Sequence, residues 1–239
     1  MPLISIKLFT TLAIAFAFAL ALPGAVMAKP VMHAKPKTTA PVPVKPAGIE
    51  AHVIASSQPD LLPDMSLGKL NAPVTVIEYA SAACPHCAAW KEEVWPAFQA
   101  KYIATGKVRY IFREVLTSPQ EYALTAFLVG RCAVKRSKDP TNSAPYFAVV
   151  DSFFTGQKSY YQNHFISVVT ADVTKKTGMT QADINACVAD TPTFDAFMAS
   201  MNAHMQQDGV SGTPTFFVNG QKTTGHEMAD LDAAITAAK

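Results

Sequence analysis

The apolar and polar positions of residues 74–113 have first the pattern of a strand, then that of a helix and then that of a strand again. They predict a strand, a helix and a second strand. The segment 74–79 is rich in β-branched residues, which is typical of a buried strand. Apolar side chains then recur at helical spacing as far as about residue 104, and Pro96 within this stretch predicts a kink. Residues 107–113 alternate between apolar and polar side chains, as a strand does. Strand, helix and strand in this order are expected to form a right-handed unit with parallel strands.

The pattern becomes mostly helical over residues 119–208. Thr180 precedes Asp183 by three positions, which predicts a capping box at the start of one helix. Thr191 and Pro192 predict the start of another helix. The apolar residues beyond that start are Phe194, Phe197, Met198, Met201 and Met205. Their spacing fits one face of a helix, and we expect this face to pack in the core rather than to bind a cofactor or a client.

Strand patterns return near the end of the chain. Residues 213–218 predict a strand, and the Asn-Gly pair that follows predicts a hairpin whose second strand is 221–224. Apolar residues at helical spacing then predict a C-terminal helix over about 228–237. Before the first strand of the β-α-β unit, residues 66–70 favour a short edge strand.

Residues 1–28 have the composition of a secretory signal peptide. Lys7 precedes an uncharged apolar stretch at residues 8–22, and small residues, including Ala28, stand where cleavage requires them. The stretch contains 15 residues, whereas a transmembrane helix needs about 20. We therefore expect cleavage and export, and the open alternative is an uncleaved segment that tethers the protein to a membrane.

Residues 29–64 are expected to form a Pro/Lys-rich linker and an N-terminal extension. Residues 29–49 hold five prolines, four lysines and no acidic residue, a composition that favours an extended chain without a core. Five of the 20 Lys and Arg residues precede Glu50, whereas all 18 Asp and Glu residues lie from Glu50 onward, so the rest is acidic by three charges. This balance argues against a nucleic-acid partner. About 190 residues remain, which suits one domain.

Two cysteines lie at the start of the helix predicted after the strand at 74–79. The motif consists of Cys84, Pro85, His86 and Cys87. Unpaired N–H groups and the helix dipole favour negative charge at a helix N-terminus, so Cys84 is expected to ionise readily. Pro85 suits the first helical position, and His86 is expected to assist ionisation through its charge or a hydrogen bond. Cys87 lies one turn inward as the predicted resolving thiol, so the chemistry indicated is reversible thiol–disulfide exchange.

The chain contains four cysteines, and an exported protein is expected to pair them. The close spacing within the motif favours Cys132 and Cys187 as the second pair. Their disulfide would close a loop of about 56 residues, which stabilises the fold by about 4 kcal/mol in the chain-entropy treatment. The alternative is two free buried thiols that pack as small apolar residues.

These elements resemble those of the DsbA family of exported oxidoreductases, which have an α/β fold of thioredoxin type with an inserted helical domain. The Pro-His dipeptide between the cysteines is similar to that of the family, as is the segment 209–215 before the predicted hairpin. The resemblance covers about residues 65–239. It implies a thioredoxin-like domain made of residues 65–118 and 209–239, with the helical insertion at 119–208.

The resemblance also implies roles for three further residues. Pro214 is expected to be cis, and Thr213 and Pro214 are expected to face the cysteines and bind an extended client segment. Glu78 is expected to be a buried acid beneath the sulfurs, the alternative being an ordinary acidic residue at a strand edge. The family further implies reduced exported proteins as clients, a DsbB-type quinone-linked membrane protein as reoxidant, no cofactor, a monomeric state and a periplasmic location.

The residues leave two other functions to consider besides disulfide donation. A disulfide isomerase or reductase could use the same fold, but isomerases resemble dimers or trimers built on an added N-terminal domain, for which residues 29–64 are short. A metal site could use Cys84, His86 and Cys87, because thiolates suit Cu(I) or Zn. A tetrahedral site needs a fourth ligand, and the sequence has no second Cys-x-x-Cys motif to supply one. We therefore expect no metal and favour a disulfide donor.

Overall fold

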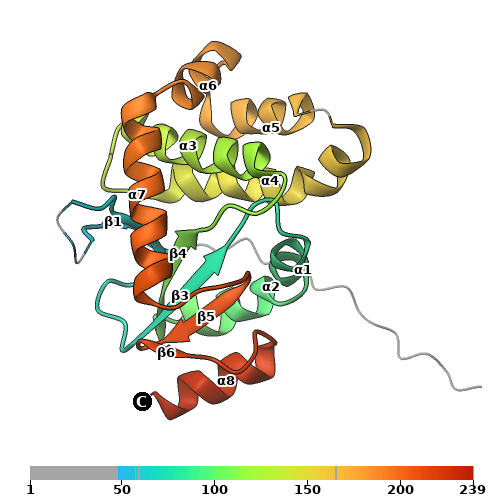
Figure 1. Cartoon of the computed structure of the whole chain (residues 1–239). Coiled ribbons are helices and arrows are strands. Elements are labelled where there is room, and N and C mark those ends of the chain that lie inside the picture. Colours follow the sequence, from blue (N-terminus) through green and yellow to red (C-terminus); the bar gives the residue numbers. More distant parts are fainter. Residues whose placement is uncertain (1–47, 57, 59, 165, 239) are drawn as a thin grey trace, which may run out of the picture. The chain divides into compact units, whose positions relative to one another are not determined.

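A mixed sheet of six strands forms the centre of the computed structural model, which describes residues 48–238 except 57, 59 and 165. The predicted signal peptide and most of the predicted linker lie outside the described residues. The strands lie in the order β1-β2-β4-β3-β5-β6 (Figure 1). Their bounds are β1 Ala51–Ile54, β2 Asp64–Leu67, β3 Val74–Ala80, β4 Val108–Glu114, β5 Thr215–Val218 and β6 Gln221–Lys222.

Strand β3 lies between β4 and β5, parallel to the first and antiparallel to the second. Helix α1 (Pro85–Glu93), helix α2 (Trp95–Phe98) and the π-helical segment η1 (Gln99–Ile103) connect β3 to β4. The predicted strand, helix and parallel strand are therefore present. The helical path is interrupted at Val94, and Pro96 lies in the first turn of α2. The predicted kink is confirmed, because proline supplies no N–H to continue the preceding turns.

The N-terminal edge of the sheet differs from the expectation of a short edge strand at residues 66–70. Strand β2 begins at Asp64 and ends at Leu67, and it lies inside the sheet because β1 pairs with it. Strand β1 has only four residues, all half-buried, so no alternation of apolar and polar positions marks it in the sequence. The N–H of Val53 in β1 also donates to the carbonyl of Thr141 at 2.8 Å.

Five helices occupy the described residues between β4 and β5. They are α3 (Gln120–Arg136), α4 (Ala144–Asn163), α5 (Ser167–Thr177), α6 (Gln181–Val188) and α7 (Thr191–Gln207). The predicted capping box is confirmed, because Thr180 and Asp183 exchange hydrogen bonds at the start of α6. Helix α7 begins at Thr191 as predicted, and its cap is the preceding residue, Asp190, whose carboxylate accepts the N–H of Thr193.

The two faces of the sheet are covered by different elements. The end of α7 covers one face, where the hydroxyl of Tyr79 in β3 donates to Asp208 at 2.5 Å. The opposite face packs against α1, α2 and η1, and helix α8 (Met228–Ala237) lies beside η1. The hydroxyl of Tyr102 in η1 donates to Asp232 in α8 at 2.6 Å. Because side chains alternate along β3, its neighbouring residues reach these different surroundings.

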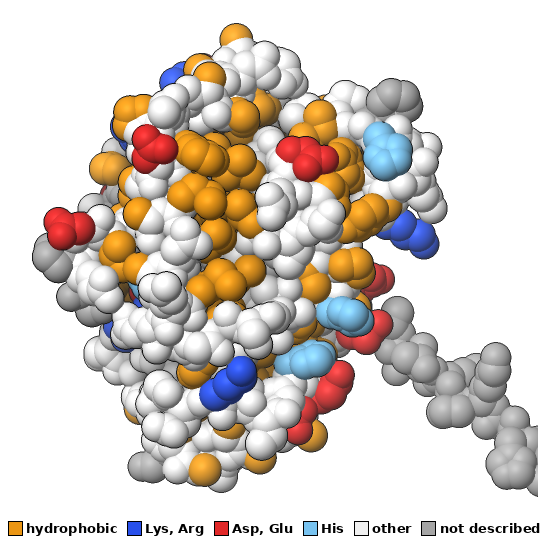
Figure 2. All heavy atoms as spheres, viewed as in Figure 1, with side chains coloured by type: hydrophobic (Ala, Val, Ile, Leu, Met, Phe, Trp, Pro, Cys, Tyr) orange, Lys and Arg blue, Asp and Glu red, His pale blue; other side chains and the backbone are white. Residues whose placement is uncertain are grey.

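The apolar stripe of α7 packs partly in the core, as the sequence predicted. Phe197 and Met201 are buried, whereas Phe194, Met198 and Met205 are half-buried against the core. On the face shown in Figure 2, apolar side chains gather over α3 and α7. The inner side of the stripe is therefore core, and its outer side contributes to an apolar surface.

Candidate active site

The cysteine motif lies where β3 leads into α1. Strand β3 ends at Ala80, a turn of residues 81–84 follows, and the helix begins at Pro85. Cys84 is the N-cap residue, with extended backbone angles of φ −80° and ψ 121°. Its N–H donates to the carbonyl of Ser81 at 3.0 Å. The strand, the tight turn and the proline together place the Cys84 sulfur at the N-terminus of a helix.

The two motif cysteines are free thiols that differ in access. Cys84 is 6% exposed, whereas Cys87 is completely buried. Pro85 and His86, between them, are exposed. An attacking group from solvent can therefore approach Cys84 but not Cys87.

Ionisation of Cys84 is favoured by several short contacts. The hydrogen bond donated by the Cys87 thiol is the largest cause, and together with the others it lowers the Cys84 pKa to about 5, although burial acts in the opposite direction. The side chain of Thr213 and the backbone N–H groups of Cys87 and His86 lower this pKa further. Cys84 is therefore a thiolate at neutral pH.

Cys87 has the opposite character. Burial raises the pKa of the Cys87 thiol far above its ordinary value, and the hydrogen bond donated to Cys84 raises it further. The negative charge of Glu78 acts in the same direction. The reduced pair therefore holds one proton, on Cys87, and one negative charge, on Cys84.

The backbone N–H of His86 contributes to the lowered pKa of Cys84. The effect of the His86 imidazole expected from the sequence stays a prediction. The residue is exposed, and water weakens electrostatic interactions of an exposed side chain. The first turn of α1 therefore acts on the sulfur through its main chain.

The loop before β5 lies against the motif. The Thr213–Pro214 peptide bond is cis, as the resemblance implied. When Cys84 is protonated, its thiol donates to the Thr213 carbonyl at 3.4 Å. A carbonyl cannot donate a hydrogen bond to a thiolate. The contact of Thr213 that stabilises the ionised sulfur therefore comes from its side chain. Thr215, the first residue of β5, pairs with Tyr79 in β3, and this pairing fixes the loop beside the end of the central strand.

Glu78 in β3 is a buried acid, with an exposure of 2%. Burial raises its pKa to about 7, although the hydrogen bond from the Tyr110 hydroxyl and the charge of Lys91 act in the opposite direction. The negative charge of Cys84 raises it slightly further. Because β3 is a central strand, Glu78 is not an ordinary acid at a strand edge. It can exchange a proton near neutral pH within electrostatic range of Cys84 and Cys87.

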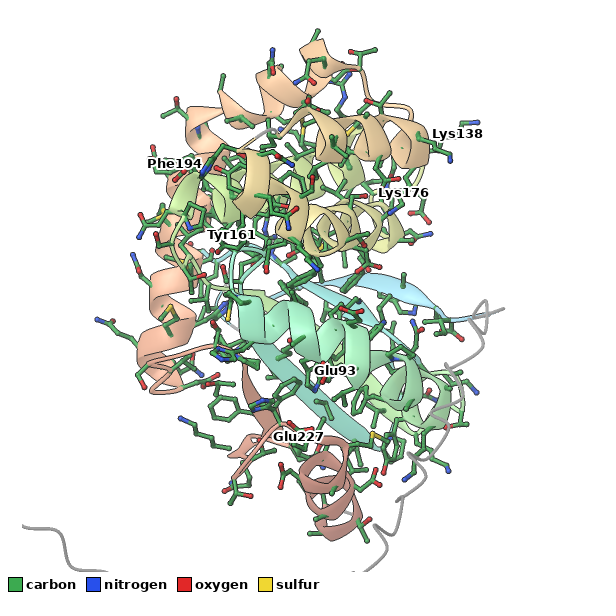
Figure 3. The ribbon with its side chains drawn as sticks, turned by 90° about the vertical axis from the view of Figure 1, so that its right-hand side faces the viewer. Glu93, Lys138, Tyr161, Lys176, Phe194 and Glu227 are labelled. Carbon is green, nitrogen blue, oxygen red and sulfur yellow. A yellow bond between two sulfur atoms is a disulfide. The ribbon has the colours of Figure 1, made fainter. Side chains whose placement is uncertain are left out.

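Helix α4 contributes two side chains to the site that sequence analysis did not identify. The amide of Gln157 donates to the carbonyls of Ala82 and Cys84, and the hydroxyl of Tyr161 donates to that of Ala83. Figure 3 shows Tyr161 at the edge of the helical layer that faces α1. These contacts join residues at least 73 positions apart in the chain, and no sequence motif marks them.

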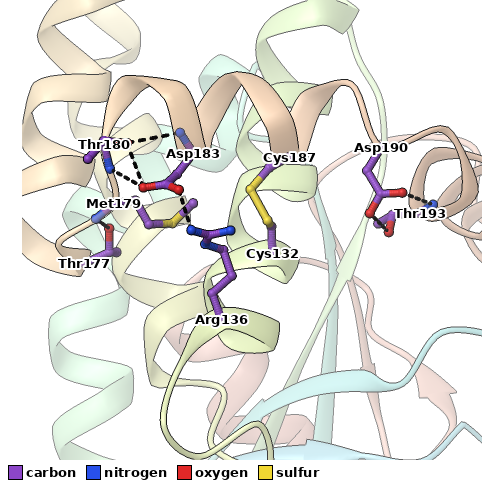
Figure 4. Close-up of a disulfide and its surroundings, with 9 residues drawn as sticks. All are labelled: Cys132, Arg136, Thr177, Met179, Thr180, Asp183, Cys187, Asp190 and Thr193. Atoms are coloured by element: carbon purple, nitrogen blue, oxygen red, sulfur yellow. Dashed lines mark hydrogen bonds and ion pairs between the residues drawn. A yellow bond between two sulfur atoms is a disulfide. The ribbon is translucent and has the colours of Figure 1, made fainter.

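Cys132 and Cys187 are joined by a disulfide that links α3 to α6 (Figure 4). Arg136 in α3 also pairs with Asp183 in α6, so the two helices are joined by a covalent bond and an ion pair. Within residues 48–238, as far as they are described, no group of three or more His, Cys, Asp or Glu side chains is arranged to hold a metal ion.

Comparisons with known proteins agree with this geometry. The thioredoxin family model matches residues 61–237. A Rickettsia bellii protein named "Putative protein-disulfide oxidoreductase" is 30% identical over 175 residues, which cover 73% of this chain and 64% of that protein. Disulfide bond formation protein D of Bacillus subtilis is 26% identical over 164 residues, covering 69% of this chain and 71% of that protein. The chain thus spans less than two thirds of the Rickettsia relative.

The solved structures include a close match in fold. The crystal structure of Wolbachia pipientis alpha-DsbA1 has a TM-score of 0.62 and 26% sequence identity, and the match covers 73% of this chain and 90% of that one. This match and that of the thioredoxin family model confirm the fold class expected from the sequence. The chain therefore belongs to the thioredoxin family, as a DsbA-like member whose thioredoxin fold carries a helical insertion.

Proposed function

We propose that this protein is an exported protein-disulfide oxidoreductase that transfers the Cys84–Cys87 disulfide to reduced client proteins. The observation that carries the proposal is the difference in acidity between the two sulfurs. A stabilised Cys84 thiolate favours the reduced pair over the disulfide, so the oxidised pair readily accepts electrons from client thiols.

The proposed reaction has two exchange steps. A client thiolate attacks the Cys84 sulfur, a client–Cys84 disulfide forms, and Cys87 leaves with the electron pair and takes up a proton. A second client thiolate then attacks the client sulfur of this mixed disulfide, so that the client disulfide forms and Cys84 leaves as a thiolate. The pair gains two electrons and one proton, and the other client proton passes to solvent. Glu78, with a pKa of about 7, is suited to deliver the proton to Cys87.

The acidity of Cys84 sets the size of the driving force. At pH 7 an ordinary thiol is protonated. The pKa of Cys84 is about 5, two units below this pH, so its thiol is ionised. At about 1.36 kcal/mol per pKa unit, this ionisation stabilises the reduced pair by about 2.7 kcal/mol. For a two-electron couple the same free energy raises the reduction potential by about 60 mV.

The surroundings of the motif support the proposed partners. Thr213 and Pro214 border Cys84 and are suited to bind an extended client segment by main-chain hydrogen bonds. The proposal includes a periplasmic location, a monomeric state, no cofactor and a DsbB-type quinone-linked membrane protein that reoxidises the pair. None of the helices in the described residues has the length and apolarity to cross a bilayer. The predicted export segment, residues 1–28, lies outside those residues.

Oxidation of a reduced, unfolded protein tests the proposal. The oxidised wild-type protein should form about one client disulfide per molecule, and Cys84→Ser should form none while remaining folded. Turnover retained in Cys84→Ser would refute the proposed role of this sulfur. Faster rearrangement of scrambled disulfides than oxidation of dithiols would instead assign the protein as an isomerase.

A further inference from the structure

Three consecutive carbonyls of the active-site turn accept hydrogen bonds from side chains of helix α4. The carbonyls of Ala82 and Cys84 accept from the Gln157 amide at 2.7 and 3.2 Å. The carbonyl between them, that of Ala83, accepts from the Tyr161 hydroxyl at 2.6 Å. Gln157 and Tyr161 are four residues apart, so they project from the same face of α4. One face of a helix in the insertion thus binds three of the four carbonyls of the turn that precedes α1.

We propose that Gln157 and Tyr161 are positioning residues for Cys84, through which helix α4 holds the active-site turn and maintains this sulfur as a good leaving group. The consequence for catalysis rests on the proposed function, whereas the effect on the ionisation of Cys84 does not. The helical insertion would then contribute directly to the redox chemistry of a motif that belongs to the thioredoxin part of the fold.

The three carbonyls and one of their two donors, Gln157, are buried, so water cannot easily replace these hydrogen bonds. Gln157 is 5% exposed, and Ala82 and Ala83 are completely buried. A buried carbonyl that loses its donor has no water molecule to replace it, so its loss is costly. The turn therefore cannot move away from α4 without leaving several polar groups unpaired.

The stability of the Cys84 thiolate depends on the position of this turn. The Cys84 thiolate is stabilised by the Cys87 thiol and by the backbone N–H groups at the start of α1. Hydrogen bonds weaken steeply when the angle or distance departs from the optimum, so a looser turn weakens all of these contacts together. The Cys84 carbonyl also accepts the N–H of Ala88 at 3.1 Å, so the tether from Gln157 and the first turn of α1 meet at one atom.

Tyr161 connects the turn to a second loop. Its hydroxyl also donates to the carbonyl of Ser118 at 3.3 Å, in the segment before α3. Burial and then the negative charge of Cys84 raise the pKa of Tyr161, so the phenol lies within electrostatic range of the sulfur. The residue is nevertheless 39% exposed, so removal of its hydroxyl leaves the packing of α4 intact.

The test compares Gln157→Met and Tyr161→Phe with the wild type as full-length reduced proteins. Methionine has a length similar to that of glutamine but lacks the amide, and phenylalanine lacks only the hydroxyl. The matched control is Tyr122→Phe, because Tyr122 is 1% exposed and its hydroxyl donates at 2.6 Å to the carbonyl of Phe153, also in α4. The measurements are the Cys84 pKa from the ultraviolet absorbance of the thiolate, the reduction potential against glutathione, and thermal unfolding.

Both variants should raise the Cys84 pKa by about one unit, a tenfold change in its ionisation constant. Their reduction potential at pH 7 should fall by about 30 mV, the equivalent of tenfold for two electrons. The control should lose thermal stability without a change in either quantity. An unchanged Cys84 pKa in both variants, or an equal shift in the control, overturns the proposal. If the wild type fails to oxidise client proteins while these shifts are seen, the proposed function fails and the positioning role stands.

Discussion

Replacing Cys87 by alanine tests why Cys84 is acidic. A helix N-terminus alone lowers a thiol pKa, but the largest single cause here is the hydrogen bond from the Cys87 thiol. A hydrogen bond to a charged group contributes about 1.5–3 kcal/mol, which equals about one to two pKa units. We therefore expect the Cys84 pKa to rise from about 5 to between about 6 and 7 in Cys87→Ala.

The assay is a pH titration of the thiolate absorbance in the ultraviolet. Cys132 and Cys187 do not titrate because they are joined in a disulfide, so Cys84 is the one thiol that the variant retains. Cys87→Ser is the matched control, since its hydroxyl can still donate to the thiolate, and it should show a smaller rise. A Cys84 pKa that stays near 5 in Cys87→Ala would show that the helix N-terminus is sufficient and that our reasoning about the thiol pair is wrong.

Three further predictions concern the couple, the buried acid and the second disulfide. The reduction potential of the motif should fall by about 30 mV per pH unit above pH 5 and by about 59 mV per pH unit below pH 5. The reason is that the reduced pair binds one proton above pH 5 and two protons below it. A single slope of about 59 mV per pH unit up to about pH 8 would contradict the low pKa of Cys84. Tyr110→Phe should raise the Glu78 pKa above about 7 in an NMR titration of carboxyl carbons, since a bond that favours the carboxylate is lost. The control Tyr146→Phe, which removes a similar bond to another buried carboxylate, should leave that pKa unchanged, and equal shifts would contradict the assignment. Replacing Cys132 and Cys187 by alanine should lower the free energy of unfolding in urea by about 4 kcal/mol, and a loss below about 1 kcal/mol would contradict the chain-entropy estimate.

Much of the fold could be predicted from local patterns. The apolar and polar periods of residues 74–113 were sufficient for β3, the kinked helices and β4, because strand alternation and helical spacing are properties of neighbouring residues. The same patterns place Cys84 at a helix N-terminus. The cis bond before Pro214 and the burial of Glu78 came from the resemblance, since spacing alone says nothing of either. Strand β1 was not predicted, because its four half-buried residues show no alternation of apolar and polar positions.

The order of the elements and the location of the reactive thiols on them follow from local patterns in the chain. Which thiol holds the proton does not, because that depends on the complete burial of Cys87 and on the groups that the fold brings around it. The fold also brings Thr213, 129 residues from Cys84, and Gln157, 73 residues away, into contact with the active-site turn. Contacts between such distant segments follow from packing of the whole chain, and no local pattern of residues encodes them.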